Sequence, residues 1–227
     1  DTNGQSDIET VTITIADVND QTPSYASIDT TPDVNEDQTQ VEVVAITDSD
    51  TNDVNACTLT GADASLFTCT VTATQYTLSF SSTQNYESPS DADNDRVYNV
   101  AVSISDGVNT GTTISYQVSL ADVDEFDVST PTDTDNTANT VAEDIANGQT
   151  VGITAAASDA DGTTNTVTYA ITAQSCAGGL QIIDSSTGVV TVGDTTALDY
   201  DTATSCTVTI KATSADGSHA SQTFTLT

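Results

Sequence analysis

The chain has almost no cations. Arg96 and Lys211 are its only basic residues besides one histidine, against 34 acidic residues, and the formal net charge is -32. A nucleic-acid-binding protein needs a basic face to replace the counterions of the phosphates, so the charge excludes that class. The same sign disfavours an anionic membrane surface. Solubility or a salty habitat would also explain an acid excess, but the clustering of the acidic residues favours divalent cations.

Other absences narrow the function further. The only histidine is His219, on a polar strand without an obvious nucleophile beside it, and there is no tryptophan. Paired carboxylates can serve a glycosidase, but here they stand at strand ends rather than in a cleft lined with aromatics. We therefore expect no enzyme. No stretch approaches the roughly 20 apolar residues of a membrane span and no signal peptide is recognisable, so we expect a mature chain or a piece of a longer one.

Four cysteines are present, and none forms a C-x-x-C pair that would indicate zinc or redox chemistry. The simplest arrangement pairs Cys57 with Cys69 and Cys176 with Cys206. These bonds would place the protein in an oxidising, extracellular compartment. Four buried free thiols are the alternative.

Two alternating segments end in acidic linkers. Val11, Ile13 and Ile15 alternate with threonines before the linker IADVNDQTP at 15–23, where Pro23 forbids further strand. The segment LADVDEF at 120–126 repeats the device after a second alternating strand. Each is the layout of a strand that leaves one β-domain and becomes the hinge to the next.

These linkers resemble the D-x-N-D-x linkers of tandem cadherin repeats, here as cadherin-like domains of a microbial extracellular protein. The resemblance implies an all-β fold of two tandem seven-stranded Greek-key β-sandwiches (cadherin/Ig-like), with an extra N-terminal β-strand and essentially no helix. Residues 1–20 would be an orphan final strand plus calcium linker, 21–124 the first repeat and 125–227 the second.

The resemblance also implies calcium as the cofactor. Calcium takes about six to eight oxygens in irregular geometry, and side chains two apart on a strand point the same way, so D-x-D at a strand end aims two carboxylates at one spot. The expected ligands are Asp17, Asn19, Asp20, Glu36, Asp48, Asp50, Asn55, Asn85, Glu87, Asp106, Asp122, Asp124, Glu125, Glu143, Asp159, Asp161, Asn165, Asp199, Asp201 and Asp216.

Several of these positions depart from the family pattern. Asn85 stands where cadherins carry Asp, Asp124 replaces Asn and Glu125 replaces Asp. The carboxylate expected after the penultimate strand would fall at Ser214, so Asp216 is a substitute. An EF-hand is rejected, because SDADGTTNTVTY lacks the glutamate at position 12. The plain alternative is that all these residues are ordinary acidic turns.

The segment DADND at 91–95 is an insertion with three further carboxylates. A separate cation site is one interpretation, and a solvated loop is the favoured one.

We expect an extracellular, cell-surface structural protein. In one hypothesis it is the subunit of a head-to-tail filament, in which Ile8–Ile15 of one copy adds to the second repeat of the next copy. Asp17, Asn19 and Asp20 would then complete a calcium site with Glu143, Asp199 and Asp201 of the neighbour and with Asp48, Asp50 and Asp106 of their own chain. In the other it is a fragment of a long adhesin, with covalently adjacent repeats as the partners and calcium as the stiffener.

Overall fold

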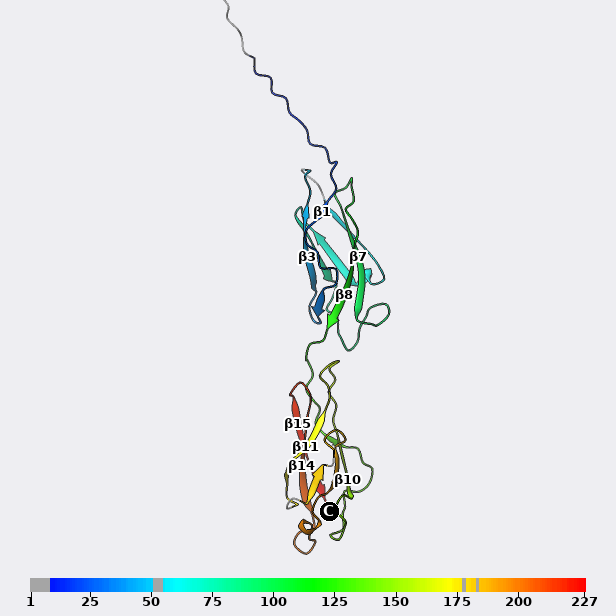
Figure 1. The fold of residues 1–227 in the computed structure, drawn as a ribbon, viewed down its shortest axis with the longest axis vertical. Helices are drawn as coiled ribbons and strands as arrows, with labels where there is room; N and C mark the ends of the chain where they lie inside the picture. The colour runs from blue at the N-terminus through cyan, green and yellow to red at the C-terminus, as the bar shows by residue number, and fades with distance from the viewer. Residues whose placement is uncertain (1–8, 51–54, 177–178, 183) are drawn as a thin grey trace, which may run out of the picture. The chain divides into compact units, whose positions relative to one another are not determined.

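The computed structural model describes residues 9–50, 55–176, 179–182 and 184–227. In these ranges the secondary structure is β-strand, with two single-turn 3-10 helices, η1 (Ala64–Leu66) and η2 (Thr195–Ala197). The all-β fold expected from the alternating segments is confirmed (Figure 1). The chain divides into two compact units, unit 1 (Asp1–Ala121) and unit 2 (Asp122–Thr227), whereas the linker pattern placed the start of the second repeat at residue 125.

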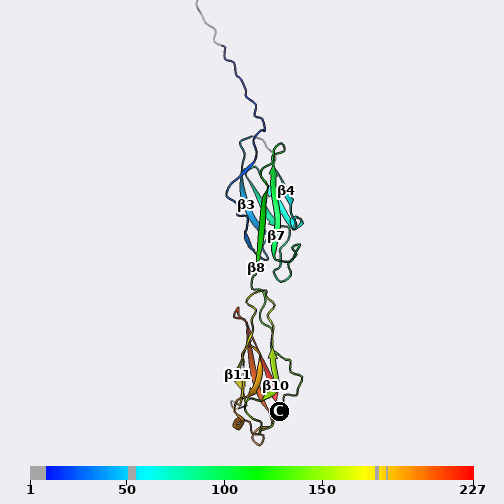
Figure 2. The same cartoon turned by 45° about the vertical axis from the view of Figure 1, so that its right-hand side comes forward.

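Unit 1 consists of two four-stranded sheets that pack face to face (Figure 2). The first sheet has the order β1 (Ser24–Tyr25), β3 (Gln40–Thr47), β6 (Gln75–Phe80) and β5 (Phe67–Val71). The second has the order β2 (Asp33–Asn35), β8 (Ile114–Ala121), β7 (Val97–Ser105) and β4 (Ala56–Thr60). Neighbours are antiparallel except β2, which pairs with β8 in parallel.

The core of unit 1 follows the two-residue period of its strands. Along β7 every second side chain is buried, from Tyr98 to Ile104, because successive side chains of a strand point to opposite faces. Between the sheets the hydroxyls of Tyr76 and Tyr116 share a 2.6 Å hydrogen bond. The Cys57–Cys69 disulfide joins β4 of one sheet to β5 of the other.

Unit 2 also has two sheets. One has the order β12 (Leu180–Ile182), β13 (Val189–Val192), β10 (Thr150–Ala156) and β9 (Thr132–Asp133). The other has the order β11 (Thr168–Gln174), β14 (Cys206–Thr213) and β15 (His219–Leu226). Val190, Val208 and Ile210 are fully buried in the core between them.

Two local features stabilise unit 2. Cys176 is bonded to Cys206, so the structure joins the same two cysteine pairs as the simplest sequence arrangement. Gly188 precedes β13 with a φ of +67°, and a Cβ there would collide with the carbonyl oxygen of Ala155. Only glycine fits this turn, because it tolerates positive φ and adds no side-chain atom.

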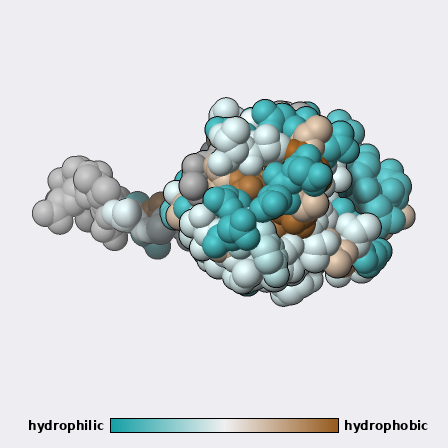
Figure 3. Space-filling model, turned by 90° about the horizontal axis from the view of Figure 1, so that it is seen from below, coloured by the Kyte–Doolittle hydropathy of each residue, from teal (hydrophilic) through white to brown (hydrophobic). Residues whose placement is uncertain are grey.

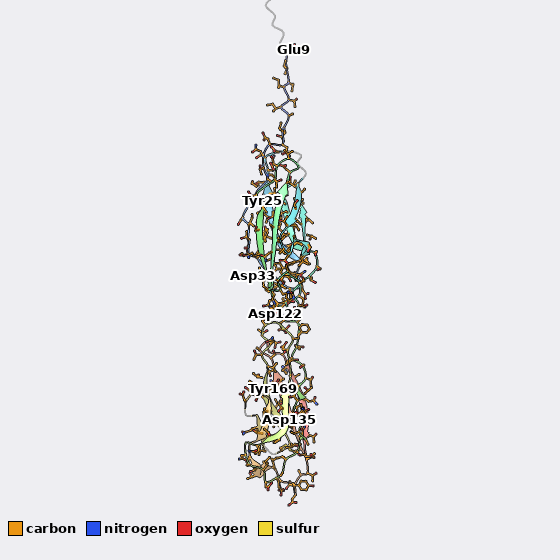
Figure 4. All side chains as sticks on the ribbon, turned by 90° about the vertical axis from the view of Figure 1, so that its right-hand side faces the viewer. Glu9, Tyr25, Asp33, Asp122, Asp135 and Tyr169 are labelled. Atoms are coloured by element: carbon orange, nitrogen blue, oxygen red, sulfur yellow. A yellow bond between two sulfur atoms is a disulfide. The ribbon has the colours of Figure 1, made fainter. Side chains whose placement is uncertain are left out.

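The strand count of unit 1 differs from the expected seven. Its described residues form eight strands, because the first strand is divided between the sheets: β1 pairs with β3, and β2 pairs with β8. Pro32, directly before β2, lacks a backbone N–H and interrupts continuous pairing. Figure 4 shows Tyr25 of β1 and Asp33 of β2 at separate levels of the unit. The described part of unit 2 has seven strands.

The prediction of an extra strand before residue 17 is wrong for the residues that the structure describes. Ile8 lies outside the described residues, and residues 9–20 form no strand (Figure 1). Val11, Ile13 and Ile15 are 75%, 83% and 91% exposed. Alternation supplies the side-chain pattern of a strand, but a strand also needs a neighbour for its backbone hydrogen bonds, and the described part of this chain supplies none for the segment.

No helix among the described residues is long and apolar enough to cross a membrane.

Candidate metal centre

At one end of unit 1, acidic side chains follow the last residues of two strands. Asp48 and Asp50 come after β3, and Asp106 comes directly after β7. The N–H of Asp50 donates to Asp48 Oδ1 at 3.2 Å, which holds both residues in one turn. The amide of Asn19 donates to the carbonyl oxygen of Asp106 at 3.4 Å. The linker and the two strand ends are therefore neighbours in space.

The linker is also held to this end through its backbone. The N–H of Gln21 donates to Asp50 Oδ2 at 2.7 Å. The side-chain amide of Asn109 donates to Asn19 Oδ1 at 3.2 Å and to the carbonyl oxygen of Gln21 at 2.7 Å. Asp17 and Asp20, in contrast, are exposed, and Asp20 accepts from the side chain of its neighbour Gln21 at 2.8 Å.

Three oxygens at this end are buried without a hydrogen-bond donor among the described residues: Asp48 Oδ2, Asn55 Oδ1 and Asp106 Oδ2. Burial raises the pKa of Asp106, but the N–H groups of Asn109 and Val108 lower the pKa more, so the side chain stays ionised. A buried polar atom without a partner is costly. Oxygens of this kind are the ligands that calcium prefers, so this end of unit 1 fits a calcium ion.

Unit 2 repeats the arrangement. Asp159 and Asp161 follow β10, and the N–H of Asp161 donates to Asp159 Oδ1 at 3.2 Å. The N–H groups of Glu125 and Phe126 donate to Asp161 Oδ1 at 3.1 and 3.2 Å. Phe126 thus occupies the position that Gln21 has in unit 1. Asp159 Oδ2 is buried without a donor in the described chain, as Asp48 Oδ2 is.

The start of the linker is held as well. Asp122, labelled in Figure 4, accepts from the backbone N–H of Thr163 at 2.7 Å and from its hydroxyl. The side-chain amide of Asn165 donates to the carbonyl oxygen of Asp161 at 2.7 Å. The contacts of Asp122 tie the loop after β10 to the linker that opens unit 2, and the contact of Asn165 holds that loop in its own turn.

A carboxylate triad lies at this end of unit 2. One side-chain oxygen of each of Asp124, Asp161 and Asp216 lies within 4.8 Å of the others. Asp161 is only 2% exposed. Burial, and then the charges of Asp216 and Asp161, raise the pKa of Asp124. Like charges this close repel one another, and a divalent cation would remove the repulsion.

Asp216 therefore lies where the sequence pattern needed a carboxylate. Ser214, at the position that the pattern indicated, is buried and donates its hydroxyl to the carbonyl oxygen of Thr164 at 3.1 Å. The turn after β14 carries Asp216 back toward the linker, and its Oδ1 accepts the N–H of Ser218 at 2.7 Å. Spacing along the strand alone could not show this return.

The resemblance assigns further ligands, and Glu36 of unit 1 and Glu143 of unit 2 make equivalent contacts. In unit 1, Glu36 is 2% exposed and its Oε2 accepts the N–H of Tyr86 at 2.7 Å. In unit 2, Oε2 of the exposed Glu143 accepts the N–H of Tyr200 at 2.9 Å. The neighbouring residues act as turn acceptors: Asn85 Oδ1 accepts the N–H of Ser88 at 2.6 Å, and Asp199 Oδ1 accepts that of Asp201 at 3.0 Å. Glu87 is half-buried.

A hollow of 140 Å³ lies beside Glu143 in unit 2, lined by Val141, Leu198, Tyr200, Leu226 and the Cys176–Cys206 disulfide. Figure 3 shows hydrophobic surface between hydrophilic patches on a face of the molecule. Drug-sized ligands usually occupy pockets of about 300 Å³ or more, so this hollow is smaller than a typical ligand pocket. Its acidic residues are Glu143 and Asp199.

One buried carboxylate, Asp63, was not singled out from the sequence and is 2% exposed. Asp91 of the segment at 91–95, which was singled out, is 3% exposed. Asp63 belongs to a short turn that reads as an ordinary polar loop, and its burial depends on strands distant in sequence. An aspartate in a turn has no sequence signal that separates a buried one from an exposed one.

The chain is similar to known proteins in part of its sequence and in its fold. Residues 137–227, within unit 2, match the family model of the cadherin domain. The match covers less than half of the chain. No curated protein matches the sequence.

Solved structures show the same fold over nearly the whole chain. The protocadherin GammaB4 extracellular domain is 21% identical with a TM-score of 0.61, over 92% of this chain and 34% of that one. The mouse cadherin-23 EC22-24 structure is 21% identical with a TM-score of 0.67, over 91% and 66%. The protocadherin gammaB7 EC3-6 cis-dimer structure is 22% identical with a TM-score of 0.60, over 93% and 50%. The chain therefore has a cadherin-like fold and spans between a third and two thirds of these proteins.

Proposed function

We propose that the chain is a calcium-dependent structural module of an extracellular, cell-surface protein, built from two tandem cadherin-like repeats. The observation that carries this proposal is the repetition of one arrangement in both units. In each, a backbone N–H of the linker donates to the second aspartate of a D-x-D pair. In each, the first aspartate keeps a buried oxygen without a donor in the described chain. Ordinary acidic turns need neither feature.

Calcium at these positions would restrict the motion of the linkers. An ion shared by the linker, the D-x-D pair and Asp106 or Asp216 would hold the linker against the unit that follows it. The linker residues would then lose the freedom of an acidic, self-repelling segment. A cell-adhesion protein needs such stiffness if its domains are to act as a rod. The ligand roles of Glu36, Asn85, Glu87, Glu143, Asp199 and Asp201 remain predictions from the family resemblance.

The test is calcium binding by the full chain. Isothermal titration with calcium after removal of divalent ions should give saturable binding, and small-angle scattering should give a narrower distribution of conformations with calcium than with chelator. The matched control is magnesium, which demands near-ideal octahedral geometry and keeps its waters. If calcium neither binds nor changes the scattering profile, the proposal is wrong.

A second candidate is the filament subunit, and the exposed segment before the first linker favours it. Val11, Ile13 and Ile15 would occupy one face of a strand and are all exposed. A strand that pairs with another sheet would bury this face and satisfy its backbone groups. The candidate partner is a second copy of this chain, so that head-to-tail contacts repeat along a filament.

Unit 2 limits how such a donor could bind. Its final strand β15 is present and pairs with β14 from Leu226 opposite Cys206 to His219 opposite Thr213. The N–H of Val141 and the carbonyl oxygen of Thr227 are also paired, at 3.0 Å. A donor strand would therefore add to a sheet edge and would not complete a sheet that lacks its last strand.

Substitution of the apolar face tests the filament. Val11→Ser, Ile13→Ser and Ile15→Ser together should abolish calcium-dependent fibres in electron microscopy. Thr12→Ser with Thr14→Ser changes the other face of the same segment and should leave the fibres intact. If the triple variant assembles like the unsubstituted chain, strand donation is refuted.

A further inference from the structure

The loop between β6 and β7 of unit 1 carries a second kind of acidic cluster, in the segment DADND at 91–95. Asp91 is 3% exposed, although Asp93 and Asp95 are exposed. Asp91 Oδ2 accepts the N–H of Asp95 at 2.8 Å. Asp91 Oδ1 is buried and has no donor among the described residues. A solvated loop explains the exposed carboxylates, but it supplies no hydrogen-bond donor to offset the cost of burying Asp91 Oδ1.

The three carboxylates converge. One oxygen of each of Asp91, Asp93 and Asp95 lies within 4.8 Å of one from each of the others. Ligand oxygens of one calcium ion stand about 2.3 to 2.6 Å from it, so two of them are up to about 5 Å apart.

The nearest cation serves another contact. Arg96 follows the cluster directly, but its Nε donates to the carbonyl oxygen of Tyr86 at 2.8 Å and its guanidinium carbon lies 4.4 Å from the centre of the Tyr86 ring. The only lysine, Lys211, belongs to unit 2. The protein thus directs its arginine to Tyr86 rather than to neutralising the cluster.

A buried aspartate of unit 1 holds the loop in place through hydrogen bonds. The buried Asp63 accepts the N–H of Ala92, inside the cluster, and the N–H of Asn99 in β7, both at 2.7 Å, so it fixes the loop to the start of β7. Asn94 and Arg96 flank Asp95 with φ angles of 59° and 68°. Non-glycine residues adopt this conformation at some cost, and here it turns the chain twice around Asp95.

We propose that residues 91–95 of unit 1 bind one calcium ion through Asp91 Oδ1 and one carboxylate oxygen each of Asp93 and Asp95, with water in the remaining positions. The donor set is oxygen only, which selects a hard cation. This site uses none of the residues assigned to the linker sites, so the proposal is independent of the proposed function. Three carboxylates from one loop place its affinity in the weak range of extracellular modules, roughly 10⁻⁴ to 10⁻³ M.

Amide NMR on the full chain tests the proposal, with calcium chloride added after removal of divalent ions. The signals of Ala92, Asn94 and Arg96 should shift and saturate. In Asp93→Asn, an exposed change that removes one ligand charge, the midpoint for these signals should rise at least about tenfold. Glu9→Gln removes one charge from an exposed residue outside any strand, and its midpoint should equal that of the unsubstituted chain.

The outcomes separate this site from the linker sites. If the loop signals stay fixed while the amides of Asp50 and Asp161 respond, the loop site is wrong and the proposed function stands. If the loop responds and the linkers do not, the reverse holds. If Asp93→Asn and the unsubstituted chain have the same loop midpoint, the shifts come from ionic strength and the loop site is also wrong.

Discussion

Replacing Asp161 by asparagine separates calcium binding from ordinary hydrogen bonding in unit 2. Asp161 accepts the N–H groups of Glu125 and Phe126 and belongs to the triad with Asp124 and Asp216. Asparagine keeps one acceptor oxygen and nearly the same volume, but it has no charge. The substitution therefore weakens the two linker hydrogen bonds with or without calcium. Its effect on the calcium site changes the stability of unit 2 only when calcium is present.

The two effects have different sizes. Hydrogen bonds to a charged acceptor contribute about 1.5 to 3 kcal/mol and neutral ones about 0.5 to 1.5, so two weakened bonds cost about 1 to 3 kcal/mol with or without calcium. A calcium ion at 100 times its Kd adds about 2.7 kcal/mol to the free energy of unfolding. For a domain of about 100 residues this raises Tm by roughly 10 to 20 °C. Asp161→Asn should lose most of that calcium-dependent rise.

Scanning calorimetry of the full chain in chelator and in calcium measures the rise. Asp50→Asn is the matched variant of unit 1, because Asp50 accepts the N–H of Gln21 in the same way. Each variant should lose most of the calcium response of its own unit, and the other unit's transition serves as the internal reference. An equal calcium response in Asp161→Asn and in the unsubstituted chain would refute the metal assignment at this triad.

Three further predictions concern stability. Replacing both Cys57 and Cys69 by alanine, which opens a loop of 12 residues, should lower the free energy of unfolding by about 3 kcal/mol on the loop-entropy model; an unchanged urea midpoint would contradict this. Burial raises the pKa of Tyr76 to about 12 from 10.0, so its contribution to stability is complete below pH 10 and is lost as the pH rises through about 12; a tyrosinate absorbance titration that shows all tyrosines ionising near pH 10 would be the opposite result. Gly188→Ala should cost more than Gly148→Ala, since both have positive φ but only Gly188 lacks space for a Cβ; equal urea midpoints would disprove the steric reason.

Much of the fold could be predicted because local patterns carry it. Tyr98, Val100, Val102 and Ile104 follow a period of two in the sequence, which is the pattern of a strand with one buried face, and each of these side chains is buried in β7. The same alternation at Val11–Ile15 predicted a strand that the described residues do not form. The difference is a hydrogen-bonding neighbour: β7 lies between β8 and β4. A period of two marks a face, and only another strand makes it part of a sheet.

The candidate sites divide in the same way. The sequence by itself determined which residues place carboxylate oxygens at strand ends near the linkers, because D-x-D at a strand end needs only the local geometry of a strand. Only the tertiary structure decided that Asp216 lies beside Asp124, that Asp63 clamps the loop at 91–95, and that Asp91 is buried with one oxygen lacking a donor in the described chain. Burial and convergence depend on strands far apart in sequence, and an aspartate in a turn looks the same whether packing covers it or water does.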